Sequence, residues 1–247
     1  MALKTTINYS PNFNLQKRTY KEIKFIIFHY TGMKKESEAV SKLTNIQSEV
    51  SSHYLIKNNG NILTLVPDLY VAWHAGKSSW KNYKSLNQHS IGIEISNPGH
   101  EFGYKKFSKK QISSLLQLSK FLSKKYKISS KNILGHSDIA PERKKDPGEK
   151  FPWEYLSKNK IGLWHTLTRQ ELIKNRRLQI SNMEKNIFLN NLFKIGYSKK
   201  ISKSLNKSRY LKNLTEAFQR RFRPELIDGK TDKECLSISI NLLKKYN

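Results

Sequence analysis

Short apolar runs alternate with amphipathic segments along the first 165 residues, and this order restricts the possible folds more than any other feature. The apolar runs are too short for buried helices and are typical of strands. They lie at residues 23–29, 54–57, 62–66, 90–95 and 133–134. Residues 37–50 and 108–126 carry apolar side chains at helical spacing. The interleaving predicts one α/β domain over residues 1–165, with a mixed central sheet flanked by helices.

Two of these segments carry specific local signals. Asn58-Asn59-Gly60-Asn61 separates two strand-like runs, and an Asn-Gly pair supplies the positive φ that a hairpin turn requires. Ser108 is placed to act as the N-cap of the helix that follows it. The apolar stripe expected to face the core in that helix consists of Ile112, Leu115, Leu118, Phe121 and Leu122.

The remainder of the chain has a different pattern. Residues 166–182 are polar and rich in Arg and Lys, which is typical of a linker or a bridging helix. Three helical patterns follow at residues 184–195, 211–222 and 233–246, and Gly196 and Pro224 end the first two. We therefore expect a small three-helix domain over residues 183–247.

The chain is strongly basic, with 46 Lys and Arg against 19 Asp and Glu and a formal net charge of +27. Such a charge favours anionic partners: a cell-wall polymer, a nucleic acid or an acidic membrane surface. A compositional bias toward Lys, Asn and Ile explains the same charge without any ligand. Residues 166–247 hold 19 basic and 7 acidic side chains, so the charge is spread over both parts of the chain.

Cysteine content and apolar runs bear on the compartment. Cys235 is the only cysteine, so no intramolecular disulfide is possible. No run of about 18 apolar residues is present, and residues 1–8 lack the apolar centre of a signal peptide. These features predict a cytoplasmic protein, or a periplasmic or outer-membrane-associated one if a leader has been removed.

The loop at residues 135–148 brings together side chains with catalytic chemistry. His136, Lys144 and Asp146 lie within it, and Pro141 and Pro147 prevent a continuous helix. His29 directly follows the buried-strand pattern Phe25-Ile26-Ile27-Phe28. Two His, one Asp and an open fourth position form the ligand set of a hydrolytic zinc site.

Such a site also needs a base and an oxyanion partner. Glu94 suits the base and Lys144 the oxyanion partner. Each residue also has an ordinary structural explanation: His29 as a hydrogen-bonded core histidine, Glu94 as a buried ion-pair partner, Asp146 as a turn residue and Lys144 as a solvated lysine.

Five ordered motifs carry a family resemblance over roughly residues 20–155. They are Phe28-His29-Tyr30-Thr31-Gly32, Ser52-His53-Tyr54-Leu55-Ile56, Ala72-Trp73-His74-Ala75-Gly76-Lys77-Ser78-Ser79-Trp80, Asn87-Gln88-His89-Ser90-Ile91-Gly92-Ile93-Glu94 and Gly135-His136-Ser137-Asp138-Ile139-Ala140-Pro141. In this order they resemble the zinc N-acetylmuramoyl-L-alanine amidases of the amidase-2 type, in the branch of bacterial recycling and outer-membrane enzymes.

The resemblance implies a surface zinc groove in the α/β domain and roles for particular residues. His29, His136 and Asp146 match zinc-binding positions, while Glu94 and Lys144 match catalytic ones. Some relatives have a catalytic tyrosine where this chain has Ser52, which favours Glu94 as the base. The resemblance also places a group of side chains at the substrate groove: His53, Trp73, His74, Asn87 and Arg143.

The C-terminal part has a weaker resemblance, to three-helix peptidoglycan-binding domains. Its motifs are Phe193-Lys194-Ile195-Gly196-Tyr197, Ala217-Phe218-Gln219-Arg220-Arg221-Phe222-Arg223-Pro224 and Ile227-Asp228-Gly229-Lys230-Thr231-Asp232. A helical tail that only packs on the catalytic domain is the alternative.

Together the two resemblances imply a Zn²⁺ hydrolase that cleaves the amide between N-acetylmuramic acid, or its anhydro form, and L-alanine. Peptidoglycan or muropeptides would be its substrates. A non-catalytic peptidoglycan-recognition protein is the main alternative. Specific nucleic-acid binding is not expected, because the lysines are scattered rather than clustered.

Overall fold

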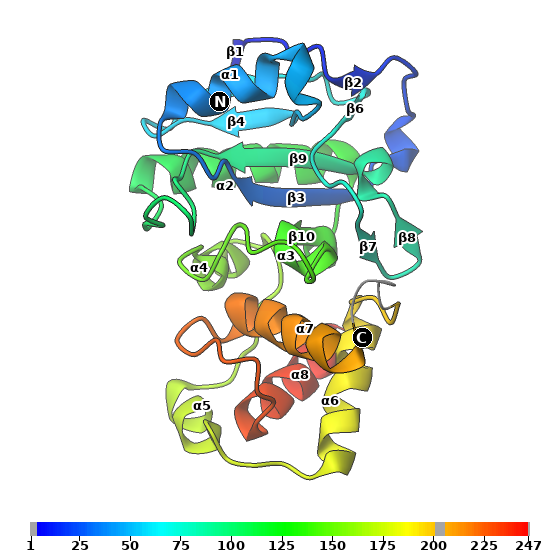
Figure 1. The fold of residues 1–247 in the computed structure, drawn as a ribbon, viewed down its shortest axis with the longest axis vertical. Coiled ribbons are helices and arrows are strands. Elements are labelled where there is room, and N and C mark those ends of the chain that lie inside the picture. The colour runs from blue at the N-terminus through cyan, green and yellow to red at the C-terminus, as the bar shows by residue number, and fades with distance from the viewer. Residues whose placement is uncertain (1–3, 201–205, 247) are drawn as a thin grey trace.

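A six-stranded mixed sheet forms the centre of the N-terminal part in the computed structural model, which describes residues 4–200 and 206–246. Its strands follow the order β1-β5-β4-β9-β3-β10 (Figure 1). The bounds are β1 Thr6–Ile7, β3 Phe25–Tyr30, β4 Tyr54–Ile56, β5 Ile62–Thr64, β9 Ser90–Ile95 and β10 Ile133–Gly135. Neighbouring strands are parallel except for the hairpin of β4 and β5.

Two small two-stranded sheets, eight α-helices and four short 3₁₀-helices complete the described part of the chain. The small sheets pair β2 (Phe13–Asn14) with β6 (Val71–Ala72), and β7 (Ser79–Trp80) with β8 (Tyr83–Lys84). The first four helices are α1 Glu36–Thr44, α2 Lys109–Tyr126, α3 His136–Ile139 and α4 Trp153–Lys158. The last four are α5 Arg169–Asn175, α6 Asn182–Ile195, α7 Lys207–Phe222 and α8 Lys233–Tyr246.

Successive side chains of the central strands point alternately to the two faces of the sheet, and each face has its own apolar cluster. Ile26 and Phe28 of β3 join Leu115 and Leu118 of α2 in one apolar cluster. Phe25 and Ile27 point the other way and join a cluster that includes side chains of the C-terminal helices. Since successive side chains on a strand point to opposite faces, His29 lies on the same face as Phe25 and Ile27.

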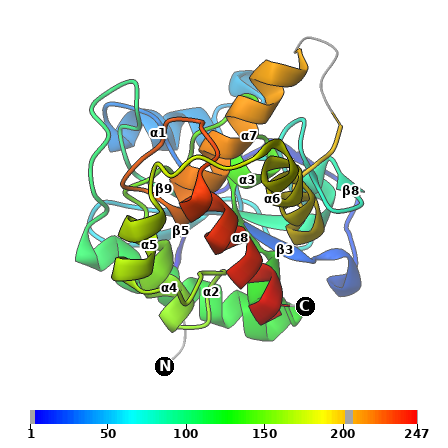
Figure 2. The ribbon, with the colours of Figure 1, turned by 90° about the horizontal axis from the view of Figure 1, so that it is seen from below.

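The C-terminal helices therefore share an apolar core with the sheet. Phe188 of α6 and Leu214 and Phe218 of α7 are fully buried in the cluster that also holds Ile27 and Leu134. Figure 1 shows α7 beneath β10 and α3. Figure 2 shows α8 between α5 and α6, and α8 packs against both.

Most of the expected secondary structure is confirmed. The hairpin forms at β4 and β5, with Gly60 at φ +88°. Ser108 caps α2, since its side chain accepts a hydrogen bond from the Gln111 amide. The three C-terminal helices and the mixed sheet also match the prediction.

Three local expectations are wrong. Helix α1 ends at Thr44 rather than continuing to residue 50, because Asn45 adopts an extended backbone and its side chain accepts from the Gln47 amide. Phe121 remains 44% exposed, so it does not belong to the buried stripe of α2. His136 does not lie on an irregular loop but begins the single helical turn of α3.

His165, the last residue of the predicted α/β domain, is a buried histidine with an unusual environment. Its ring stacks on Trp164 with centroids 4.9 Å apart. Both ring nitrogens are buried and neither makes a hydrogen bond of good geometry within the described residues, although the nearby Phe222 backbone partly offsets the effect of burial on the pKa of the ring. Burial lowers the pKa of His165 below its usual value of 6.5, so the unfolded chain binds a proton at this position more readily than the folded chain.

Acid should therefore destabilise the protein partly through His165. Above the unfolded-state pKa of about 6.5 the ring is neutral in both states, and His165 does not reduce the free energy of unfolding. As the pH falls below this value, the unfolded chain binds a proton at His165 and the free energy of unfolding decreases. We expect His165→Phe, which keeps a planar ring against Trp164, to raise the free energy of unfolding at pH 5 by about 1 kcal/mol or more. Urea unfolding at pH 5 and pH 8 measures this. Equal acid sensitivity of wild type and variant would contradict the explanation.

No helix in residues 4–200 and 206–246 is both long enough and apolar enough to cross a membrane.

Candidate metal centre and its pocket

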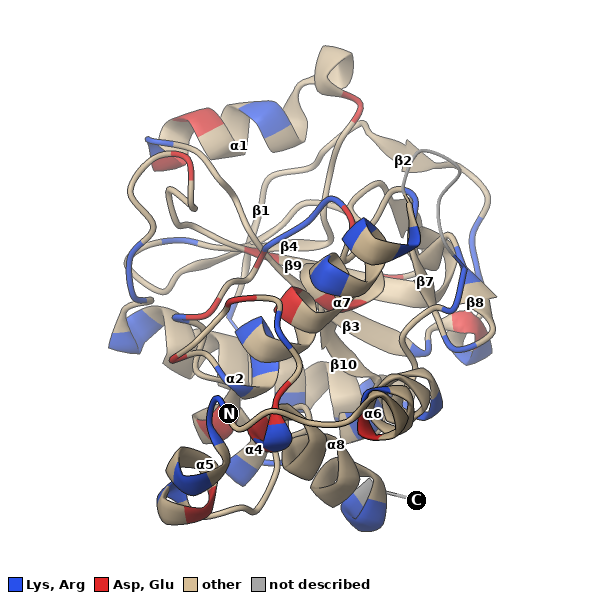
Figure 3. Cartoon of the chain, turned by 60° about the horizontal axis from the view of Figure 1, so that its bottom comes forward, with Lys and Arg blue, Asp and Glu red and all other residues tan. Residues whose placement is uncertain are grey.

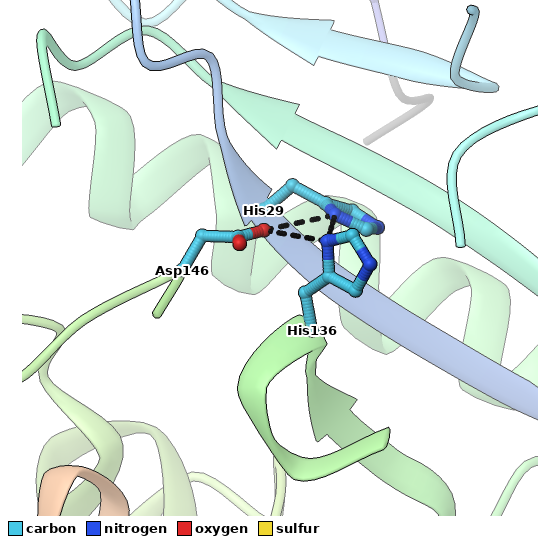
Figure 4. A group of neighbouring side chains, drawn as sticks. All are labelled: His29, His136 and Asp146. Carbon is cyan, nitrogen blue, oxygen red and sulfur yellow. Dashed lines mark hydrogen bonds and ion pairs between the residues drawn. The ribbon is translucent and has the colours of Figure 1, made fainter. Parts of the chain in front are cut away.

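Three side chains converge at the carboxyl-terminal ends of the parallel strands. His29 lies near the end of β3, His136 directly follows β10, and Asp146 returns from the loop after α3. The Nδ1 atoms of the two histidines are 2.9 Å apart. Asp146 Oδ2 lies 3.1 Å from His29 Nδ1 and 2.9 Å from His136 Nδ1 (Figure 4). The predicted ligand set is therefore brought together, and all three residues are buried.

Hydrogen bonds on the far side of His29 determine which of its nitrogens carries a proton. Ser90 donates its hydroxyl proton to the Leu86 carbonyl at 2.6 Å, so its oxygen can only accept from His74 Nε2, 3.2 Å away. His74 Nδ1 is then an acceptor, and His29 Nε2 donates to it at 3.0 Å. The remaining nitrogen of neutral His29, Nδ1, faces Asp146 with a lone pair.

His136 has the same arrangement. Its Nε2 lies 3.2 Å from the Ala75 carbonyl oxygen and 3.5 Å from Arg143 Nη2; the nearer partner is the carbonyl, which can only accept a hydrogen bond. In its neutral form the ring therefore also presents the Nδ1 lone pair to the centre. Two imidazole lone pairs and a carboxylate oxygen thus meet at one point.

This convergence of acceptors fits a bound cation. Burial, and then the neighbouring His136, lower the pKa of His29 to about 4, which keeps it neutral at pH 7. Burial alone would raise the pKa of Asp146, and the opposing effect of His136 and His29 depends on protons carried by those rings, so with both rings neutral a bound cation would be needed to stabilise the carboxylate. Tetrahedral zinc with bonds of about 2.0–2.2 Å holds its ligand atoms about 3.3–3.6 Å apart, a few tenths of an ångström more than the observed 2.9–3.1 Å.

Glu94 lies on the strand beside His29. The two residues are register partners on β9 and β3, so alternation places both side chains on the same face of the sheet. Glu94 Oε2 is buried and has no hydrogen-bond partner among the described residues. Burial, reinforced by the Asp146 carboxylate, raises the pKa of Glu94 to about 8. An unpaired carboxylate with a raised pKa is suited to accept a proton near neutral pH.

A cavity of about 400 Å³ opens in front of these residues. Four basic side chains line it: Lys42, Arg143, Lys144 and Lys145. Lys144 is half-buried in this wall. Arg143 is fixed by hydrogen bonds to the carbonyls of Ala75 and Lys77. Lys42, on α1, was not predicted from the sequence as a site residue.

The other predicted groove residues fall into two groups. Trp73, His74 and Arg143 line the cavity. His53 and Asn87 do not line it. His53 is fully buried, with Nδ1 accepting from the Gly92 amide and Nε2 next to the Tyr70 carbonyl. Asn87 accepts hydrogen bonds from the amides of His74 and Ala75, and so it holds the His74 loop in place.

Ser90 and Gly92 contribute to the site without having been predicted. Both lie on the same face of β9 as Glu94. A Cβ at Gly92 would lie 2.4 Å from the His74 ring, so only glycine leaves room for that ring against the strand. The Ser-x-Gly-x-Glu alternation in residues 90–94 was the sequence signal for this arrangement.

The chain is similar to known amidases over almost its whole length. The family described as N-acetylmuramoyl-L-alanine amidase matches residues 19–149. N-acetylmuramoyl-L-alanine amidase AmiD of Escherichia coli strain K12 is 36% identical over 239 residues, which cover 92% of this chain and 84% of AmiD.

Two solved structures share the fold. One is E. coli AmiD in complex with the substrate anhydro-N-acetylmuramic acid-L-Ala-D-gamma-Glu-L-Lys; it has a TM-score of 0.78 and 34% identity over 94% of this chain and 93% of that one. The other is AmpDH3 from Pseudomonas aeruginosa in complex with anhydromuramic pentapeptide; it has a TM-score of 0.78 and 32% identity over 98% of each chain.

Proposed function

Since this chain belongs to the N-acetylmuramoyl-L-alanine amidase family, we propose that it is a zinc hydrolase acting on muropeptides. The bond cleaved is the amide between the lactyl group of N-acetylmuramic acid, or its anhydro form, and L-alanine. The observation that supports zinc most directly is the convergence of His29 Nδ1, His136 Nδ1 and Asp146 Oδ2 within 3.1 Å of one another.

The three converging residues would hold the metal, and the residues around them would carry the proton transfers. Bound zinc lowers the pKa of a coordinated water toward about 7 and polarises a carbonyl. Glu94 is placed to accept the proton of the attacking water and to return it to the nitrogen of the leaving L-alanine. Lys144, in the cavity wall, supplies a positive charge for the oxyanion that develops on the substrate carbonyl.

The basic cavity wall suits an anionic substrate. The peptide part of a muropeptide carries free carboxylates, and the substrate bound to AmiD contains a D-gamma-Glu residue. Lys42, Arg143 and Lys145 line the same cavity as the catalytic residues, so peptide carboxylates can pair with them while the amide lies at the metal. Trp73 and His74 would contact the substrate near the reacting bond.

A non-catalytic recognition protein is a weaker explanation. A protein that only binds peptidoglycan needs neither a base nor a complete ligand set. Here the three converging residues are assembled, and Glu94 Oε2 beside them has no hydrogen-bond partner in the part of the chain that the structure describes. That combination favours catalysis.

Metal removal tests the proposal directly. Purified protein is incubated with an anhydro-muropeptide, with or without a zinc chelator, and the products are identified by mass spectrometry. We expect release of the intact stem peptide, loss of that release on chelation and recovery on adding zinc. Cleavage that persists in fully chelated protein would contradict the proposed zinc dependence but not the amidase activity.

We also propose that residues 183–247 bind peptidoglycan, beside a catalytic part at residues 1–165 and a connecting segment at 166–182. A second groove supports this; it is lined by Lys185, Leu189, Ser208, Leu211, Lys212, Thr215 and residues 228–231. Basic side chains are spread over both parts of the chain (Figure 3). Co-sedimentation of the chelated, inactive protein with purified sacculi should detect binding, and a protein that stays in solution would count against it.

A further inference from the structure

Helix α3 connects the metal centre to the C-terminal helices. It begins with the ligand His136, and the Ser137 amide donates to the Asp146 carbonyl at 2.8 Å. One short turn thus positions two of the three converging side chains. The same turn packs against α7 and β7, so it lies between the catalytic cavity and the C-terminal helices (Figure 1).

Asp138 in this turn is the point at which the two regions meet. It is 1% exposed. Its Oδ2 accepts from the Gly135 amide at 2.8 Å, which closes the junction between β10 and α3. Two more donors come from the C-terminal part: Tyr197, two residues after α6, whose hydroxyl donates to Oδ1 at 2.8 Å, and Arg221 of α7, whose guanidinium donates to Oδ2.

Arg221 is held on several sides. It is 3% exposed, and its second terminal nitrogen donates to the Ile133 carbonyl of β10 at 3.1 Å. Its guanidinium lies over the Trp153 ring, 4.1 Å from the centroid. A guanidinium fixed in this way cannot follow Asp138 if the turn shifts, and no other salt bridge to Asp138 is found among the described residues.

Tyr197 is a second residue of the C-terminal part that is fixed next to the Asp138 carboxylate. Its ring packs edge-on against Trp80 of β7, with centroids 4.9 Å apart. The preceding residue, Gly196, accepts a hydrogen bond from the Lys81 amide at 2.6 Å. A Cβ at Gly196 would lie 2.4 Å from the Trp80 ring, so the backbone approaches that ring as closely as glycine permits.

From these contacts we infer that Arg221 and Tyr197 are positioning residues for the metal centre, acting through Asp138. A buried carboxylate that loses its cation draws in water or moves toward it. Movement of Asp138 displaces α3, and with it His136 and the Ser137–Asp146 hydrogen bond. The C-terminal helices thereby contribute to metal affinity, in addition to any binding of peptidoglycan. The inference rests on the metal centre proposed above.

The test compares two buried arginines in the whole 247-residue chain. Arg221→Met removes the charge next to Asp138 and keeps an unbranched side chain over Trp153. Arg223→Met is the matched control, because Arg223 is 1% exposed and its salt bridges among the described residues are all to C-terminal residues, namely Asp228, Asp232 and Glu234. Zinc affinity is measured by competition with a chromophoric chelator, at a temperature at which circular dichroism shows each variant to be folded.

We expect Arg221→Met to weaken zinc binding about 10- to 100-fold. Arg223→Met should change zinc affinity less than about threefold, even if it lowers Tm as much as Arg221→Met does. Equal affinities in the wild type and Arg221→Met would overturn the coupling. If Arg221→Met does not fold, Tyr197→Phe is measured in its place. This variant removes one hydroxyl, keeps the ring against Trp80 and should weaken zinc binding several-fold. Unchanged zinc affinity in Tyr197→Phe would overturn the inference. A wild type that binds no zinc would instead refute the metal centre itself.

Discussion

Glu94→Gln is expected to lower kcat by about 10²- to 10⁴-fold, while zinc affinity changes little. The glutamine amide has nearly the shape of the carboxylate but cannot accept the proton of the attacking water. Glu94 is not one of the converging ligands, so its replacement leaves the metal site intact. Product release from an anhydro-muropeptide, measured together with zinc content, separates loss of the base from loss of the metal.

The pH profile provides a second readout for the same variant. A base must be deprotonated to act, so activity should increase with pH through the pKa of Glu94. Burial raises that pKa to about 8, and a cation held by the neighbouring ligands would lower it, so the rise should be centred below about 8. We expect this rise to disappear in Glu94→Gln.

Glu101→Gln is the matched control, because Glu101 lines the same cavity but is exposed. It should keep its rate within a few-fold of the wild type and retain the dependence on pH. Equal losses in the two variants would show that the cavity needs negative charge in general rather than a base at residue 94.

Strand periodicity made the centre of this site predictable from the sequence. Short apolar runs identified β3, β9 and β10, and parallel strands bring their carboxyl ends to one edge of the sheet. His29, Glu94 and His136 each lie at or directly after such an end. Asp146 and Lys144 lie in a loop with no periodicity of its own; their residue types next to His136 singled them out, and the family resemblance then implied their roles.

Contacts between distant segments were not predictable. The Asp138–Arg221 pair joins positions 83 residues apart, and a single sequence carries no signal for such pairing. His53 occurs in a motif and was assigned to the groove, but the fold buries it completely, with its ring against His74 and its nitrogens next to the Gly92 amide, the Tyr70 carbonyl and the Arg18 guanidinium. Motif membership identifies a histidine that matters, whereas only the packing shows whether it faces the cavity.

Asp146→Asn is expected to remove most of the stabilisation that zinc provides. Zinc at about a thousand times its Kd stabilises a folded protein by about 4 kcal/mol, which corresponds to a Tm increase of roughly 8–16 °C for a chain of this size. Asparagine lacks the negative charge that offsets the cation. If affinity falls about a hundredfold, about 2.7 kcal/mol of this stabilisation is lost at the same zinc concentration.

Without zinc, the order of Tm between the wild type and Asp146→Asn should be reversed. Without a cation, Asp146 Oδ2 faces two imidazole nitrogens that also present lone pairs. The asparagine amide can donate to one of them, so metal-free Asp146→Asn should unfold at or above the Tm of metal-free wild type. Calorimetry with zinc and with chelator measures both effects.

Asp68→Asn is the control for loss of a buried carboxylate elsewhere. Asp68 accepts hydrogen bonds from Tyr54, Tyr126 and Lys125, and it does not line the cavity. Its replacement should lower Tm with and without zinc and leave the zinc-dependent increase unchanged. If Asp146→Asn instead kept the full increase, Asp146 would not be a ligand, and His29 and His136 would have to bind the ion without it.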